Sequence, residues 1–483
     1  MRIKNLFTLA VIFITLTGVA QAIEEELFFR PIEVKDGSTL SIMDCVSAAF
    51  KNSPKIKRQK YNLDIAKSRV GIAKSQYFPV FSAGAGFFNE NNSNSIYYDS
   101  HYREVPNVGV SVNKLIWNFG KTTAFIKMEE FYKIGAEYEF MDSLCATLFD
   151  VKAKYYNVLK EEAMGRVWQE NININERFLK LAKKEPDISS AKVYLSQSKV
   201  KMLDAKNGLQ NAIVDLNNSM YLSGYPDYKL QNTPTFNLSA DFTNKINNDA
   251  FKTQDFNFNE VKAVEIAYES SPDLHVLEAT KNAMEQSLKY VKRTYLPDLT
   301  AGAGYNYRHT NKASNNGLTV GVNLSSNINL MELKHSIKGA DAELKLADNE
   351  IELFKKDLYY EVKRAFNNIN RAERQIPIAK MSAEEAFENL KLVENKYKSD
   401  SVTYTALQDA RKDYVDEMLK YVECIYNYNI ALIQAEMAMH YHIVDIHEKS
   451  EHAVHYHSDD LIKHLTEALD CDKHEEHHKH DKL

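Results

Sequence analysis

The sequence contains two copies of one pattern, separated by 218 residues. The tetrapeptide AGAG at residues 83–86 returns at residues 301–304, and each copy follows a proline, Pro79 in the first and Pro297 in the second. Self-similarity at a fixed spacing indicates a repeated architecture. We therefore predict an internally duplicated chain, built from two units of roughly 200 residues each.

Each unit is predicted to run helix, strand, strand, helix, helix. Apolar residues recur every three or four positions in the helical segments and every second position in the strands. The predicted domains are a signal segment (1–22), a first repeat (23–224), a connector (225–257), a second repeat (258–440) and a C-terminal tail (441–483). The predicted strands occupy residues 80–89, 106–116, 298–308 and 317–328.

Two long helices, at residues 122–184 and 335–398, restrict the fold further. At 1.5 Å per residue, more than 60 residues make a rod of roughly 90 Å, which packs against parallel neighbours and not around one small core. The polar stretch at 165–176 and Pro377 are expected to kink or interrupt these rods. The opening helices are predicted at 40–74 and 258–293, and the closing helices at 189–222 and 403–440.

The first 22 residues have the pattern of a secretory signal. Two basic residues precede an apolar run, and Ala20-Gln21-Ala22 fits a small-residue cleavage site. An uncleaved anchor is the alternative. No later segment approaches 18 consecutive apolar residues, the length that would span a bilayer as a helix. The mature protein is therefore predicted to be exported, with no helix holding it in a membrane.

The strands alternate large aliphatic residues with small or polar ones. This alternation fits either an ordinary sheet with one face on a core or a membrane strand of about 10 residues. The export signal and the polar loops of uneven length favour the membrane strand. The predicted membrane-facing residues are Val108, Val110, Val112, Leu318, Val320, Val322 and Leu324. Aromatic residues expected to gather at one strand end, as in an interfacial girdle, are Phe87, Phe88, Tyr97, Tyr98, Tyr305 and Tyr307.

Four strands in one chain cannot close a membrane sheet. Hydrocarbon satisfies no open strand edge, and closed membrane barrels have about 8 strands or more. Two chains would supply about 8 strands and a filled interior, whereas three would supply about 12 and leave room for a pore. If the protein conducts, three copies are the smallest sufficient number.

The order of these elements resembles the TolC family of outer-membrane efflux channels. WNFG (117–120) resembles the family's turn into the long helix, although the second copy reads NLME and lacks the glycine. AFNNIN (365–370) and YKSDSVTYTALQDA (397–410) are similar to the second-repeat helix and its helix–helix turn. The resemblance covers residues 38–440, and the order of the motifs, occurring twice, is its most specific part.

The resemblance implies a mainly α fold with membrane β-structure. The implied assembly is a homotrimer with a long α-helical barrel in the periplasm and a 12-stranded transmembrane β-barrel in the outer membrane of a Gram-negative bacterium. Such a duct serves a tripartite efflux pump or a type I secretion system. It docks onto a periplasmic adaptor and an inner-membrane RND or ABC transporter, and passes drugs, toxic compounds or polypeptides unchanged.

The resemblance also implies a gate at the periplasmic entrance. Asp409 falls on one of two acidic positions that ring the entrance in the family, with Thr403 and Tyr404 in the preceding turn. A carboxylate in each chain around a narrow axis would favour cations. The alternative is a solvated helix-face aspartate. Three positions depart from the family's pattern: Ala406 replaces the first acid, Val402 a basic residue and Asp400 the turn glycine.

Other function classes lack support in the sequence. The AGAG copies follow a helix and have no third glycine three residues on, so they do not form a dinucleotide loop. A net charge of −6 leaves no basic footprint for nucleic acid. We predict no enzyme and no cofactor. The alternative function is a soluble periplasmic coiled-coil scaffold or tether, and a third is a channel dedicated to metal ions.

The C-terminal tail is rich in histidine. The candidate metal ligands are His474, His477, His478 and His480. Imidazole nitrogens bind Zn²⁺, Cu²⁺ or Ni²⁺, but clustered histidines do so in almost any flexible peptide, so a solvated tail without a metal role is the alternative. If the tail gathers metal, deleting the residues after 445 should impair metal tolerance and spare drug export.

Overall fold

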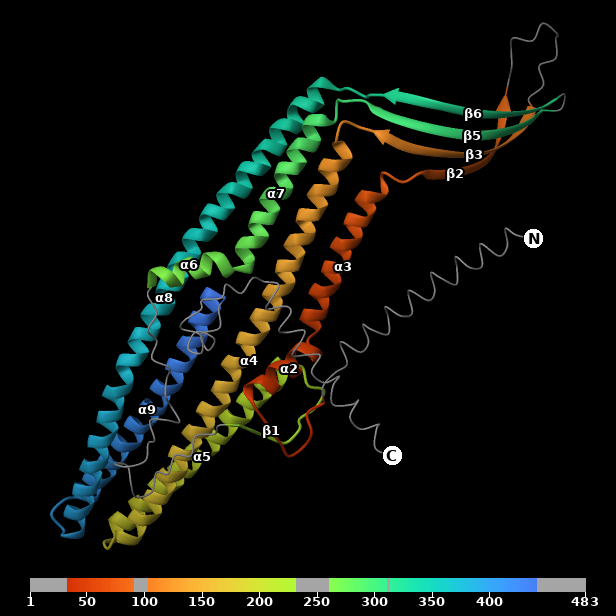
Figure 1. Cartoon of the computed structure of the whole chain (residues 1–483). Coiled ribbons are helices and arrows are strands. Elements are labelled where there is room, and N and C mark those ends of the chain that lie inside the picture. The colour runs from red at the N-terminus through yellow and green to blue at the C-terminus, as the bar shows by residue number, and fades with distance from the viewer. Residues whose placement is uncertain (1–32, 91–102, 232–259, 311–312, 441–483) are drawn as a thin grey trace, which may run out of the picture. The chain divides into compact units, whose positions relative to one another are not determined.

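The computed structural model in Figure 1 describes residues 33–90, 103–231, 260–310 and 313–440. It divides into two compact units. The first contains the described parts of residues 1–57, 141–271 and 356–483, and the second contains the described parts of residues 58–140 and 272–355. The predicted signal segment and tail, and most of the predicted connector, lie outside the described residues.

The opening helix of each repeat is two helices. In the first repeat these are α2 (Ile42–Asn52) and α3 (Pro54–Ser75), and in the second α6 (Glu260–Ser270) and α7 (Pro272–Arg293). The expected single helices at 40–74 and 258–293 were therefore wrong. Each break falls at a Ser-Pro pair, because proline fits the first position of a new helix but not the interior of an old one. Both serines, Ser53 and Ser271, are 0% exposed.

The second unit contains a four-stranded antiparallel sheet in the order β2-β3-β5-β6 (Figure 1). Its strands are β2 (Val80–Glu90), β3 (Arg103–Trp117), β5 (Asp298–Thr310) and β6 (Ala313–Ser325). β2 pairs with β3 and β5 with β6 within each repeat, and the β3–β5 pairing joins the two repeats. Because the pairing is antiparallel throughout, β6 runs opposite to β2, and these two strands form the edges of the sheet.

Two helical hairpins follow the strands. The first is α4 (Lys121–Leu181) with α5 (Glu185–Ser219), and the second is α8 (Leu330–Lys398) with α9 (Tyr404–Met439). Neither long helix is interrupted, so the expectation of an interruption at 165–176 or at Pro377 was wrong, whereas a kink at either place stays a prediction. Pro377 is exposed, as is Glu373, whose carbonyl loses its partner to the proline. Water can hydrate that carbonyl, which removes part of the penalty for proline inside a helix.

The ends of both hairpins lie in the first unit, where α9 is buried along much of its length. Lys152 on α4 donates from Nζ to Glu436 Oε2 on α9 at 2.8 Å, with both side chains 7% exposed. A short parallel strand pair, β1 (Ser38–Leu40) with β4 (Tyr228–Leu230), packs nearby, and the Tyr155 hydroxyl donates to the Gln231 carbonyl at 2.6 Å. Among the described residues, no helix has the length and apolar character needed to cross a membrane.

Candidate membrane face and candidate gate

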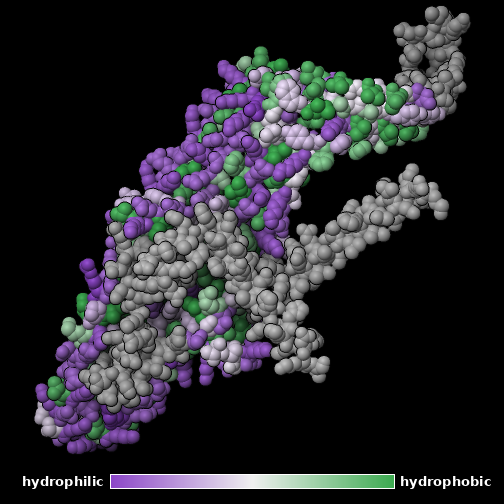
Figure 2. Space-filling model, viewed as in Figure 1, coloured by the Kyte–Doolittle hydropathy of each residue, from purple (hydrophilic) through white to green (hydrophobic). Residues whose placement is uncertain are grey.

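The sheet of the second unit has one apolar face. Residues directly opposite each other in an antiparallel pair share a face. The register aligns Phe81, Val112, Ala303 and Val320 across the four strands, and the next row outward is Ala83, Val110, Tyr305 and Leu318. All seven predicted membrane-facing residues lie on this face: Val108, Val110, Val112, Leu318, Val320, Val322 and Leu324. Figure 2 shows hydrophobic residues along the strands, and Val320 is 74% exposed.

The opposite face is small and polar. It carries all seven glycines of the four strands: Gly84, Gly86, Gly109, Gly302, Gly304, Gly317 and Gly321. The residues between them are mainly asparagine, serine and threonine. A Cβ on Gly302 would collide with Asn113 Oδ1 on the neighbouring strand, so a side chain there would force that asparagine to move. Glycine therefore leaves room for an asparagine that faces away from the apolar surface.

The aromatic residues expected at one strand end are described only in part. Phe87, Tyr305 and Tyr307 lie on the apolar face and are exposed. Tyr97 and Tyr98 lie outside the described residues, as does the side chain of Phe88. The girdle therefore remains a prediction.

The WNFG turn joins β3 to α4. The Asn118 side chain accepts from the Thr122 backbone N–H at 3.3 Å and so caps the helix. Gly120 has φ of 80°, and a Cβ there would lie 2.7 Å from Arg293 Nη1, whose other contact is the Gly120 carbonyl at 3.1 Å. The NLME turn of the second repeat needs no glycine because none of its residues adopts a positive φ. Its Asn329 caps α8 by accepting from the Glu332 N–H at 3.3 Å.

The turn between α8 and α9 carries the predicted gate residues. The helix ends in a Schellman motif, in which Ser401 donates to the Lys396 carbonyl at 2.9 Å and Asp400 to the Tyr397 carbonyl at 3.0 Å. Asp400 adopts φ of 55° in this motif. This is the left-handed conformation that glycine adopts without strain, and it accounts for the family's glycine at this position.

Replacing Asp400 with glycine is expected to stabilise this turn. The left-handed conformation costs a residue with a Cβ about 1 kcal/mol, less the extra backbone freedom of glycine in the unfolded chain. Slower amide hydrogen exchange at residues 399–403 would record the gain. Asp400→Ala is the matched control, because it removes the carboxylate but keeps the Cβ, and it should give no stabilisation. Faster exchange in the glycine variant would contradict the prediction.

The three predicted gate residues have different surroundings. Thr403 is the N-cap of α9, and its Oγ1 accepts from the Ala406 N–H at 3.2 Å. Tyr404 is buried, and its hydroxyl accepts from Gln408 Nε2 at 2.7 Å. Asp409 is exposed on the following turn of α9. The structure thus brings Thr403 and Tyr404 together at the start of the helix and leaves the Asp409 carboxylate facing solvent.

Two contacts join the hairpins near their turns. The Tyr397 hydroxyl on α8 donates to Asp187 Oδ2 on α5 at 2.9 Å, and Arg177 Nη2 on α4 lies 3.2 Å from Glu394 Oε2 on α8. Burial, followed by the bond to Asp187, raises the pKa of Tyr397, which keeps its proton in place to donate. A cavity of about 200 Å³ lies between the two turns, lined in part by Lys183, Lys184 and Lys398.

Sequence reasoning missed a buried polar network that lies two turns further from the end. It joins Asn171 and Asn175 on α4 with Gln408 and Arg411 on α9, all of them buried. These asparagines belong to the stretch at 165–176 that was expected to interrupt α4. The available signal was their spacing of four residues in line with the apolar stripe, which places both on the buried side of a helix.

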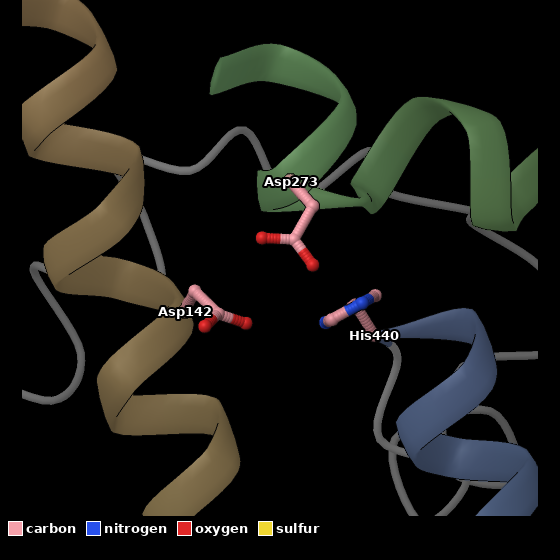
Figure 3. A group of neighbouring side chains, drawn as sticks. All are labelled: Asp142, Asp273 and His440. Atoms are coloured by element: carbon pink, nitrogen blue, oxygen red, sulfur yellow. The ribbon is translucent and has the colours of Figure 1, made fainter. Parts of the chain in front are cut away.

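Among the described residues of the first unit, the structure gives no support for a metal site. Asp142 on α4 and His440 at the end of α9 are its candidate ligands (Figure 3). Asp273, also drawn there, is the second residue of α7 and belongs to the second unit. Two ligands are fewer than the three or four that zinc usually takes from a protein. The predicted tail ligands His474, His477, His478 and His480 lie outside the described residues.

Solved outer-membrane channels share this fold. The channel OprN matches with a TM-score of 0.68 and 11% identity over 85% of this chain and 94% of that chain. CusC matches with a TM-score of 0.69 and 12% identity over 85% and 95%. The CmeC outer membrane channel of Campylobacter jejuni matches with a TM-score of 0.67 and 14% identity over 82% and 85%. At these identities the likeness concerns the fold. A search of curated proteins finds no match.

A family model described as outer membrane efflux protein matches residues 45–188 and 263–438. The two matched segments fall in the two repeats and together span more than half of the chain. The resemblance to TolC-family channels is thereby confirmed. Channels of this family are passive ducts and not enzymes. The chain belongs to the outer membrane efflux protein family.

Proposed function

We propose that three copies of this chain form a passive export channel. Four strands from each copy would make a 12-stranded β-barrel in the outer membrane of a Gram-negative bacterium, and the helical hairpins would make a tunnel in the periplasm. The observation that carries the proposal is the division of the sheet into an exposed aliphatic face and a face of glycine and uncharged polar residues. Such a sheet suits lipid on one side and a water-filled lumen on the other.

The edges of the sheet support assembly from several copies. Within the described part of the chain, β2 and β6 each have one unpaired side, and they run in opposite directions. The β6 edge of one copy can therefore pair antiparallel with the β2 edge of the next, and the ring closes without a change of pattern. Closure is required because a lipid-exposed strand edge leaves its backbone groups without hydrogen-bond partners.

Exposed apolar residues on the helices support the same assembly. Within the second unit, α3 exposes Tyr61, Ile65 and Ile72, and within the first, α5 exposes Val193, Val200 and Leu203. Each set repeats at helical spacing and so forms a stripe along its helix. We propose that neighbouring copies cover these stripes in the tunnel wall.

The proposed partners are a periplasmic adaptor and an inner-membrane transporter of the RND or ABC class, as in a tripartite efflux pump or a type I secretion system. The proposed cargo comprises drugs, toxic compounds or polypeptides, and metal ions if the histidine-rich tail gathers them. A deletion strain scored in parallel for drug sensitivity, metal sensitivity and loss of secreted proteins distinguishes these cargoes.

The proposal is tested by fractionation and by conductance. A channel should sediment with the outer membrane, migrate as a heat-sensitive trimer in SDS and conduct ions in planar bilayers. Purification as a soluble periplasmic monomer without conductance would overturn the channel and favour the coiled-coil scaffold.

Replacing Asp409 with lysine is expected to abolish cation preference. In a trimer the change replaces three negative charges near the proposed entrance with three positive ones, and ion selectivity in a narrow pore follows the sign of such a ring. Reversal potentials across a salt gradient would measure the shift. Asp204→Lys is the control, because Asp204 is an exposed residue of α5 in the same unit. An unchanged reversal potential in the Asp409 variant would remove this residue from the gate.

A further inference from the structure

Arg411 is a buried cation that forms no ion pair with a carboxylate of the described residues. Its side chain is on the second turn of α9 and is 9% exposed. Its Nε donates to Gln408 Oε1 at 2.7 Å, and its Nη1 donates to Asn171 Oδ1 across the interface with α4. The guanidinium carbon also lies 5.7 Å from the ring centre of Tyr194 on α5. Among the described residues, no carboxylate lies within ion-pair distance of it.

These contacts replace only some of the hydrogen bonds that water would form with the guanidinium. A guanidinium has five N–H donors, and two of them donate to amide oxygens that carry no net charge. Burial of a charge without a counter-ion is unfavourable, because the interior solvates it less well than water. In agreement, burial lowers the pKa of Arg411, which means that this site disfavours the charged form.

A neighbouring copy of the chain cannot easily supply a carboxylate to pair with the buried guanidinium. The side chain is enclosed by α4, α5 and α9 of its own chain, so a carboxylate of a second copy would have to displace those helices to reach it. Arg411 differs in this respect from Asp409, which is exposed and open to contact with other copies.

The guanidinium of Arg411 lies at the interface between the two hairpins, so its environment changes when they separate. Moving α9 away from α4 breaks the bond from Arg411 to Asn171 and admits water to the guanidinium. The same movement breaks the contacts Tyr397–Asp187 and Arg177–Glu394. Breaking them exposes no buried, unpaired charge to water, so it brings no comparable gain in hydration. The contacts at the turns therefore favour the closed arrangement of the hairpins, and the buried charge of Arg411 favours their separation.

We propose that Arg411 is a positioning residue that favours opening of the gate, by making the closed contact between α9 and α4 a poor environment for its charge. This inference rests on the proposed channel and concerns the regulation of its entrance. The contacts at the turns hold the hairpins together, and the buried charge keeps the closed state from becoming too stable to open.

The test compares Arg411→Met with the wild type in single-channel recordings. Methionine has a similar length and no charge, so the closed interface becomes more favourable. The open probability should fall about tenfold, the change that corresponds to about 1.4 kcal/mol. Arg411→Lys keeps the charge and should stay near the wild type. Lys412→Met is the matched control, because it removes an adjacent positive charge that is exposed, and it should change nothing.

A higher or unchanged open probability in Arg411→Met would overturn the inference, since the arginine would then hold the gate closed or not act on it. Heat-sensitive trimer migration checks assembly, and Arg411→Gln, which keeps a polar group for Asn171, replaces the methionine variant if that variant fails to assemble. Adding either substitution to Tyr397→Phe should reduce the leak of that variant. Absence of conductance in the wild type and in Tyr397→Phe would instead contradict the proposed channel.

Discussion

Replacing Val320 with lysine is expected to abolish assembly in the outer membrane. Val320 lies in the middle of β6, opposite Ala303, and is 74% exposed on the apolar face. If this face meets lipid, a lysine near the bilayer midplane costs about 2–4 kcal/mol in each chain. Three copies multiply that cost, because all the strands insert into one barrel. The trimer band should disappear from SDS gels, and the variant should be absent from the outer-membrane fraction.

Thr319 provides the matched control for this change. It is the adjacent residue of β6, and the alternation of the strand places it on the glycine-rich face, opposite Gly304. Lysine at Thr319 introduces the same charge at nearly the same depth but in the proposed water-filled lumen, so assembly should persist. If both variants assembled equally well, the apolar face would not be the membrane face. If both failed, the sheet would tolerate no lysine at this level and the assignment of the faces would lose its support.

The duplication made the main elements predictable from the sequence. Alternation over residues 318–324 and 108–112 is strong enough to reveal a strand, and its two faces follow from the period of two. Pairing of β2 with β3 and of β5 with β6 follows from hairpins between neighbouring strands. The pairing of β3 with β5 does not, because these strands are nearly two hundred residues apart and nothing local specifies their register.

The errors have local physical causes. The apolar periodicity continues across Ser53-Pro54 and Ser271-Pro272, which concealed both helix breaks. β1 and β4 have three residues each, too few to show alternation. The stretch at 165–176 was expected to kink or interrupt α4 because it is polar. Asn171 and Asn175 are nevertheless buried, and Asn171 bonds to Arg411, a partner 240 residues away.

At the candidate gate, too, the contacts between residues distant in sequence could not be predicted. Its turn was located from a resemblance, and Thr403 and Tyr404 do lie at the start of α9. The partner of Tyr397 was not predictable, because Asp187 is 210 residues away in sequence and on a different hairpin. A side-chain contact between distant elements depends on how the helices pack, which the local pattern of either helix does not contain.

Replacing Tyr397 with phenylalanine is expected to open the channel. The change removes one oxygen from each chain and leaves the ring, so packing against Tyr404 persists, with ring centres 5.6 Å apart in the wild type. What is lost is a bond from a phenol to a carboxylate, worth about 1.5–3 kcal/mol when one group is charged. The other contact near the turns, Arg177 with Glu394, has an arginine that is 51% exposed and stabilises less.

The loss should raise the open probability by about tenfold or more, since about 1.4 kcal/mol changes an equilibrium tenfold. In cells, the leak should appear as sensitivity to a large antibiotic that the outer membrane normally excludes. Asp187→Asn should act in the same direction but less strongly, because a neutral amide oxygen still accepts a hydrogen bond from the tyrosine. Tyr225→Phe removes the same atom from a residue that is 79% exposed and should have no effect. If Tyr397→Phe conducted like the wild type, the contact with Asp187 would not hold the gate closed, and the hairpins would have to be held by contacts between copies.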